Sequence, residues 1–164
     1  MAEVPRYIIN ASVVTKWHLR DEEYVPQALT ILNNFQQGRI DLLAPRHIQL
    51  EVASSILKAS RRGRLSRQDA SASIDLIGGW GLTLLAHPPL GQVRYYAEWL
   101  TTSFYDGLFV ATSVLTQYPL LSADHHLRNA ARDKFPFVPQ KPVSTPSADS
   151  STLQESRRRE GTRP

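Results

Sequence analysis

Short apolar runs alternate along the chain with longer segments in which apolar residues recur at helical spacing. This alternation predicts strands at 7–9, 42–44, 82–85 and 120–121, with a last strand near Phe137. Between them it predicts helices at 11–19, 25–37, 46–62, 66–78, 91–100, 105–117 and 125–133. Strands separated by helices imply right-handed crossovers, so we expect a mainly parallel sheet with helices on both faces. In such sheets, working sites lie at the carboxyl ends of the strands.

Composition divides the chain into one domain and a tail. The 164 residues are 41% hydrophobic and 21% charged, as expected of an ordinary folded domain, which the apolar rhythm places at 1–138. Residues 139–164 are rich in Pro, Ser, Thr and Arg and have few aliphatic side chains, so we expect them to be disordered. The tail has five basic residues against three acidic ones, so it contributes half of the net charge of +4. The folded domain is therefore only mildly basic.

The absence of cysteine narrows the possible chemistry. A chain without cysteine has no disulfide framework, thiolate zinc site or thiol nucleophile, and it suits a reducing cytoplasm. The sequence begins without a basic and then apolar leader, and its apolar runs are too short to span a bilayer. We therefore expect a cytoplasmic protein without a membrane partner. Any bound metal must use oxygen or imidazole ligands.

Polar side chains occur where the predicted strands end. Asn10 follows the first strand, Asp124 follows the strand at 120–121, and Asp106 begins the apolar helix that leads into that strand. Glu51 belongs with them because it lies on a polar stripe of the helix at 46–62, whose members are His47, Glu51, Ser55 and Lys58. A cleft beside the sheet edge would explain this stripe.

Four blocks of the sequence resemble the PIN-domain ribonucleases, and among them the VapC-type toxins of toxin–antitoxin pairs. The blocks are Tyr7–Trp17, Leu43–Pro45 with Glu51–Ala53, Tyr105–Ala111, and Pro119–Asp124 leading into His125–Leu127. They occur in the family's order between about Arg6 and Val138. The resemblance implies a three-layer α/β/α PIN-like fold.

The same resemblance implies a function. It implies an endoribonuclease that depends on Mg²⁺, with Mn²⁺ as an alternative, and that hydrolyses RNA with Glu51, Asp106 and Asp124 as catalytic residues. Position 10 would join these three residues as a metal ligand. Clustered carboxylates suit a hard divalent cation, which lowers the pKa of a bound water and neutralises charge on the phosphate. A homodimer and an antitoxin protein are the further partners that the resemblance implies.

Asn10 departs from the family pattern, in which this position is an aspartate. The amide keeps an oxygen donor but removes a full negative charge, so metal affinity should fall. Three interpretations follow: an active nuclease with an unusual ligand, a catalytically impaired module that binds RNA or an antitoxin, and a chain altered to relieve toxicity. The sequence is compatible with all three.

Structural roles compete with these functional ones. Asn10 and Asp124 are placed to cap helices, and Asp106 suits the third position of a capping box that begins at Ser103. A basic cluster suits either RNA phosphates or a solvated helix end, and its members are Lys58, Arg61, Arg62, Arg64 and Arg67.

Overall fold

The computed structural model describes residues 3–132 of the chain. The strand predicted near Phe137, the end of the predicted domain at 138 and the predicted tail at 139–164 lie outside these residues.

A four-stranded parallel sheet forms the centre of the molecule. Its strands are β1 (Arg6–Ile9), β2 (Asp41–Pro45), β3 (Thr83–Leu85) and β4 (Leu120–Leu121), in the order β3-β2-β1-β4. In β1, Ile8 pairs with Leu43 of β2 on one side and with Leu120 of β4 on the other. Ile8 and Leu120 are completely buried, which explains why these strands are apolar without alternation.

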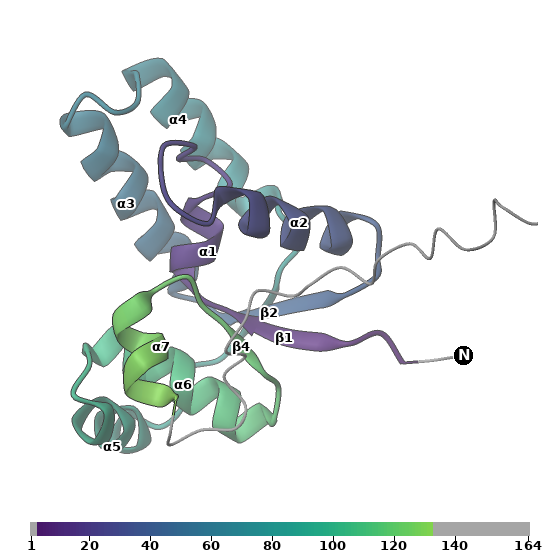
Figure 1. Ribbon diagram of the computed structural model, residues 1–164, viewed down its shortest axis with the longest axis vertical. Helices are drawn as coiled ribbons and strands as arrows, with labels where there is room; N and C mark the ends of the chain where they lie inside the picture. Colours follow the sequence, from purple (N-terminus) through teal and green to yellow (C-terminus); the bar gives the residue numbers. More distant parts are fainter. Residues whose placement is uncertain (1–2, 133–164) are drawn as a thin grey trace, which may run out of the picture.

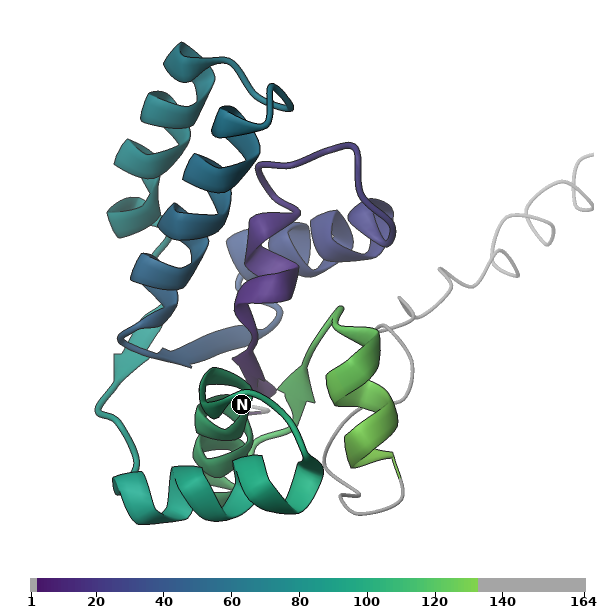
Figure 2. The same ribbon diagram turned by 90° about the vertical axis from the view of Figure 1, so that its left-hand side faces the viewer.

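Helices cover both faces of the sheet (Figure 1). One face carries α1 (Ala11–Thr15), α2 (Val25–Gln36), α3 (Ile48–Arg61) and α4 (Arg67–Leu76), and the 3₁₀ turn Ile77–Gly79 follows α4. The other face carries α5 (Leu90–Leu100), α6 (Phe104–Thr116) and α7 (His125–Ala131). Figure 2 shows the same three layers from the side, with α3 and α4 rising together away from the sheet. The predicted α/β/α architecture with a parallel sheet is confirmed.

The first helix is shorter than predicted. It ends at Thr15 rather than at residue 19, and turns lead from there to α2. Trp17 is still buried, and its indole N–H donates to the carbonyl of Ala28 at 3.0 Å. The apolar pattern of this segment therefore reflects packing of a folded loop rather than two further turns of helix.

Helix α6 places its first turn at the carboxyl edge of the sheet. Its middle residues, 107–113, are buried between the sheet and α5. Between residues 3 and 132, we find no helix with both the length and the apolar character needed to cross a membrane.

Candidate active site

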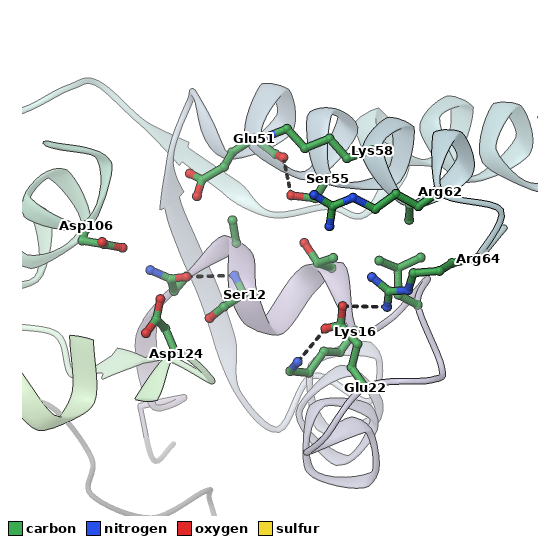
Figure 3. A pocket seen from close by; sticks show the side chains of 15 residues that line it. Ser12, Lys16, Glu22, Glu51, Ser55, Lys58, Arg62, Arg64, Asp106 and Asp124 are labelled. Carbon is green, nitrogen blue, oxygen red and sulfur yellow. Dashed lines mark hydrogen bonds and ion pairs between the residues drawn. The ribbon is translucent and has the colours of Figure 1, made fainter. Parts of the chain in front are cut away.

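The four polar residues singled out from the sequence line one pocket of about 320 Å³ (Figure 3). Asn10 joins β1 to α1, Glu51 lies in the first turn of α3, Asp106 lies in the first turn of α6, and Asp124 joins β4 to α7. The pocket therefore lies at the carboxyl ends of β1 and β4, where a parallel sheet presents the start of each following helix.

Two of these residues, Asn10 and Asp124, cap helices, and Asp106 is the third residue of a capping box that begins at Ser103, as the capping patterns predict. The side-chain oxygen of Asn10 accepts from the backbone N–H of Ser12 at 2.8 Å. Asp124 uses Oδ1 to accept from the backbone N–H groups of His126 and Leu127, at 2.7 and 3.1 Å. Asp106 Oδ2 accepts from the Ser103 hydroxyl at 2.7 Å. Each cap fixes its side chain on a rigid helix end.

The hydrogen bonds at the helix ends leave an oxygen available in the two aspartates but a nitrogen in Asn10. Asp124 Oδ2 accepts no hydrogen bond within residues 3–132, and the Ser103 hydroxyl binds only Oδ2 of Asp106. The Asn10 side chain has committed its one oxygen, so the atom left over is Nδ2, which is buried without a partner among the described residues. Each aspartate can therefore offer a second oxygen to a cation, whereas the remaining polar atom of the Asn10 side chain is a hydrogen-bond donor.

His47 lies one helical turn before Glu51 and close to its carboxylate. The Nε2 atom of His47 lies 3.2 Å from Glu51 Oε2, although neither atom makes an aligned hydrogen bond. The largely buried imidazole also packs against the rings of Tyr105 and Phe109, with centroid distances of 5.7 and 4.9 Å. The polar stripe of α3 thus divides: Glu51, Ser55 and Lys58 line the pocket and His47 does not.

The acids affect one another electrostatically. Burial raises the pKa of Asp106 above its usual range, and the negative charges of Asp124 and Glu51 raise it further against the opposing hydrogen bonds from Ser103. Two like charges within mutual influence disfavour the ionised state of a third carboxyl. A bound cation would therefore reduce the repulsion among the carboxylates at this end of the pocket.

Ser12 connects two of the loops that carry site residues, a role that the sequence reasoning missed. Its hydroxyl accepts from the backbone N–H of Ala123 at 3.0 Å and lies 3.4 Å from the hydroxyl of Ser122. Ser122 in turn accepts from the backbone N–H of Asp124 at 3.1 Å. These contacts fix Asp124 relative to Asn10. The sequence did offer a signal for this role, since Ser12 and Ser122 each lie two residues from a polar site residue, Asn10 and Asp124.

The far end of the pocket carries basic side chains, two of which are paired with acids. Lys16 Nζ lies 2.7 Å from Glu22 Oε2, and the Arg64 guanidinium donates to both Asp21 oxygens and to Glu22, at 2.7 to 2.9 Å. Glu22 is partly buried, which acts to raise its pKa, but hydrogen bonds from Lys16 and Arg64 bring the pKa below the usual range. The network ties the loop after α1 to the end of α3.

The basic cluster is divided between two surfaces. Lys58, Arg62 and Arg64 line the pocket of the acidic residues. Arg61 and Arg67 line a separate pocket between α3 and α4. The five cations therefore belong to two separate pockets.

The chemistry of the acidic end fits a divalent cation. Glu51, Asp106 and Asp124 offer carboxylate oxygens, the ligands that Mg²⁺ and Mn²⁺ prefer. No three His, Asp or Glu side chains in the described part of the chain converge into a ready-made metal cluster. To coordinate one ion, the three carboxylates would therefore have to draw closer together.

Comparison with solved structures identifies the fold. PAE2754 from Pyrobaculum aerophilum superposes with a TM-score of 0.59 at 20% identity, over 79% of this chain and 87% of that one. VapC20 of Mycobacterium tuberculosis, a toxin that cleaves the sarcin-ricin loop, superposes with a TM-score of 0.53 at 14% identity, over 76% of this chain and 94% of that one. The chain has a PIN-like fold, which it shares with these two proteins. No protein-family profile and no curated protein matches the sequence.

The PIN-type fold agrees with the resemblance seen in the four sequence blocks. At 14–20% identity the likeness establishes architecture alone. The function of this chain therefore depends on the chemistry of its pocket.

Proposed function

We propose that the protein is a divalent-cation-dependent endoribonuclease that hydrolyses RNA phosphodiester bonds at the acidic end of the pocket. One observation carries this proposal: three carboxylates from three separate helix ends line one pocket, and each aspartate keeps an oxygen that its cap does not use. Glu51, Asp106 and Asp124 would hold Mg²⁺ or Mn²⁺, with Asn10 at the fourth position.

The cation and the chain would divide the work. When bound, the cation would activate a water for attack on the phosphodiester and neutralise charge on the phosphate. Hydrogen bonds at the helix ends hold the two aspartates in place, and the His47 imidazole lies 3.2 Å from the carboxylate of Glu51. A covalent nucleophile is not required by this scheme.

The likeness to VapC20 supports the choice of RNA, since that protein is described as cleaving the sarcin-ricin loop. Together with the sequence resemblance, it also supports an antitoxin protein as a partner. A homodimer remains an expectation from the resemblance.

Asn10 favours a second candidate function. Its single oxygen caps α1 and its amide nitrogen is buried without a partner among residues 3–132, so position 10 adds no negative charge to the site. A site with three charges in place of four holds a cation less firmly. The alternative is therefore a catalytically impaired PIN-type module that binds RNA or an antitoxin.

Cleavage of a mixed RNA pool separates the two candidates. The purified protein is incubated with Mg²⁺, with Mn²⁺ or with EDTA, beside the variants Asn10→Asp and Asp106→Ala. We expect cleavage that EDTA abolishes and that Asp106→Ala lowers at least about 100-fold, the usual loss when one major catalytic interaction is removed. Asp69→Ala is the matched control, because Asp69 forms the same box with Ser66 on α4, outside the pocket.

The unmodified protein and the Asn10→Asp variant decide between the candidates. If only Asn10→Asp cleaves, the site is correct but the natural chain is an impaired module. If neither the unmodified protein nor Asn10→Asp cleaves RNA with either cation, the nuclease proposal is wrong.

A further inference from the structure

Two basic side chains at the basic end of the pocket are not paired with an acid among the described residues. Lys16 and Arg64 are balanced by Glu22 and Asp21 at 2.7 to 2.9 Å. Lys58 and Arg62 are exposed side chains that form no ion pair with any acid among residues 3–132. The uncompensated positive charge at this end therefore comes from these two residues.

Lys58 and Arg62 continue the face of α3 that begins at Glu51 (Figure 3). They follow Glu51 by seven and eleven residues, close to two and three helical turns. At 1.5 Å per residue, they lie about 10 and 16 Å along the helix axis from the acidic end. One helix face thus joins the acidic end to two free cations.

These distances are long enough to span more than one phosphate of a nucleic-acid strand. A strand carries one negatively charged phosphate per nucleotide, so a strand that lies along α3 brings its phosphates past both side chains. Cations at this spacing can neutralise phosphates on one side of a phosphodiester that occupies the acidic end.

We propose that Lys58 and Arg62 bind backbone phosphates of an RNA strand on one side of the bond at the acidic end, and so position the strand along α3. The identity of the strand as RNA rests on the proposed function. The division of roles among the basic residues rests on the geometry: Arg64 is a structural tie, and Arg61 and Arg67 face a different pocket.

Salt-dependent RNA binding tests this assignment without any cleavage. Fluorescence anisotropy measures the affinity of the full-length chain for a labelled single-stranded 12-nucleotide RNA in EDTA, at several salt concentrations. The test variant is Lys58→Ala with Arg62→Ala. The control variant is Arg61→Ala with Arg67→Ala, which removes the same charge from the same region but from the other pocket.

Losing two phosphate contacts has a defined signature. The slope of log affinity against log salt should fall by about 1.4 in the Lys58/Arg62 variant, at about 0.7 for each contact to a single strand. If the affinities meet at 1 M salt, this slope predicts an affinity loss of about 25-fold at 0.1 M. The Arg61/Arg67 variant should stay within about twofold of the unmodified protein, and Lys58→Arg with Arg62→Lys should keep the slope because it keeps both charges.

The possible failures are distinguishable. If both double-alanine variants weaken binding equally, the effect is general electrostatics and the assignment to Lys58 and Arg62 is overturned. The assignment is also wrong if the Lys58/Arg62 variant binds RNA like the unmodified protein. Those two residues would then be candidates for binding an acidic protein partner instead. If the unmodified protein binds no RNA at all, the proposed function fails together with this inference.

Discussion

At the scale of single residues, the site depends on which atom of each capping side chain remains free. Asn10, Asp106 and Asp124 were recognisable from the sequence both as helix-capping residues and as members of one sheet edge. The structure shows that Asn10 and Asp124 cap helices, that Asp106 accepts from the capping Ser103, and that all three line the pocket. The sequence could not reveal that the Asn10 amide nitrogen is left over, because that orientation depends on the N–H of Ser12 and on burial by distant residues.

The raised pKa of Asp106 predicts a stability cost that depends on pH. Because the pKa is higher in the folded than in the unfolded state, the folded protein binds this proton more tightly, and ionisation as the pH rises destabilises the fold. Asp106→Asn is neutral at every pH, and its amide oxygen can still accept from Ser103. In EDTA, we expect this variant to unfold at a higher temperature than the unmodified protein at pH 7, with a smaller gain at pH 4.5.

Asp69→Asn provides the comparison for this stability measurement. Asp69 accepts from the hydroxyl of Ser66 at 2.6 Å, as Asp106 does from Ser103, but it is exposed. Its replacement removes a favourable charge at a helix N-terminus, worth about 0.3–1 kcal/mol, so we expect no gain at pH 7. An Asp106→Asn variant that is less stable than the unmodified protein at pH 7 would contradict a raised pKa of Asp106.

At the scale of elements, the contact between α5 and α6 holds Asp106 at the edge of the sheet. Gly107 lies directly after Asp106, and a Cβ there would come within 2.7 Å of the carbonyl oxygen of Val93 and 2.9 Å of the backbone nitrogen of Ala97. The two helices can approach this closely because Gly107 has no side chain.

Gly107→Ala should therefore push the two helices apart. We expect the free energy of unfolding to fall by about 1–3 kcal/mol, the usual cost of overpacking, as measured by urea denaturation. Gly91→Ala on α5 is the control, because a Cβ at that position meets nothing within 4 Å. Its replacement should leave stability unchanged or raise it by up to about 1 kcal/mol. Equal stabilities of the two variants would contradict the close packing at Gly107.

Most elements were predictable because their ends carry local signals. Ser66 with Asp69 marks the start of α4, and Ser103 with Asp106 marks the start of α6. The segment after α1 was predicted less well. Its turns are held by Arg64, which binds Asp21 from 43 residues away, and no local pattern encodes a contact of that range.

At the scale of the whole molecule, the PIN-type fold brings opposite charges to the two ends of one pocket. The acidic end gathers side chains from the ends of separate helices around the sheet, and the basic end follows α3. Sequence blocks predicted this fold and the acidic members of the pocket. The sequence could not show which basic residues are paired with acids, which are unpaired and which line the other pocket. That depends on how α3, α4 and the loop after α1 are arranged in space.

Mn²⁺ binding measured by isothermal titration calorimetry tests the central claim most directly. The claim is that the three carboxylates hold one cation and that Asn10 supplies no charge to it. We predict weak one-to-one binding by the unmodified protein. Asn10→Asp, which can keep the cap and add a carboxylate oxygen, should bind at least about tenfold more tightly, or ~1.4 kcal/mol. Asn10→Ser, which also suits a helix cap but adds no charge, should show no such gain. An Asn10→Asp variant that binds Mn²⁺ no more tightly than the unmodified protein would contradict the account.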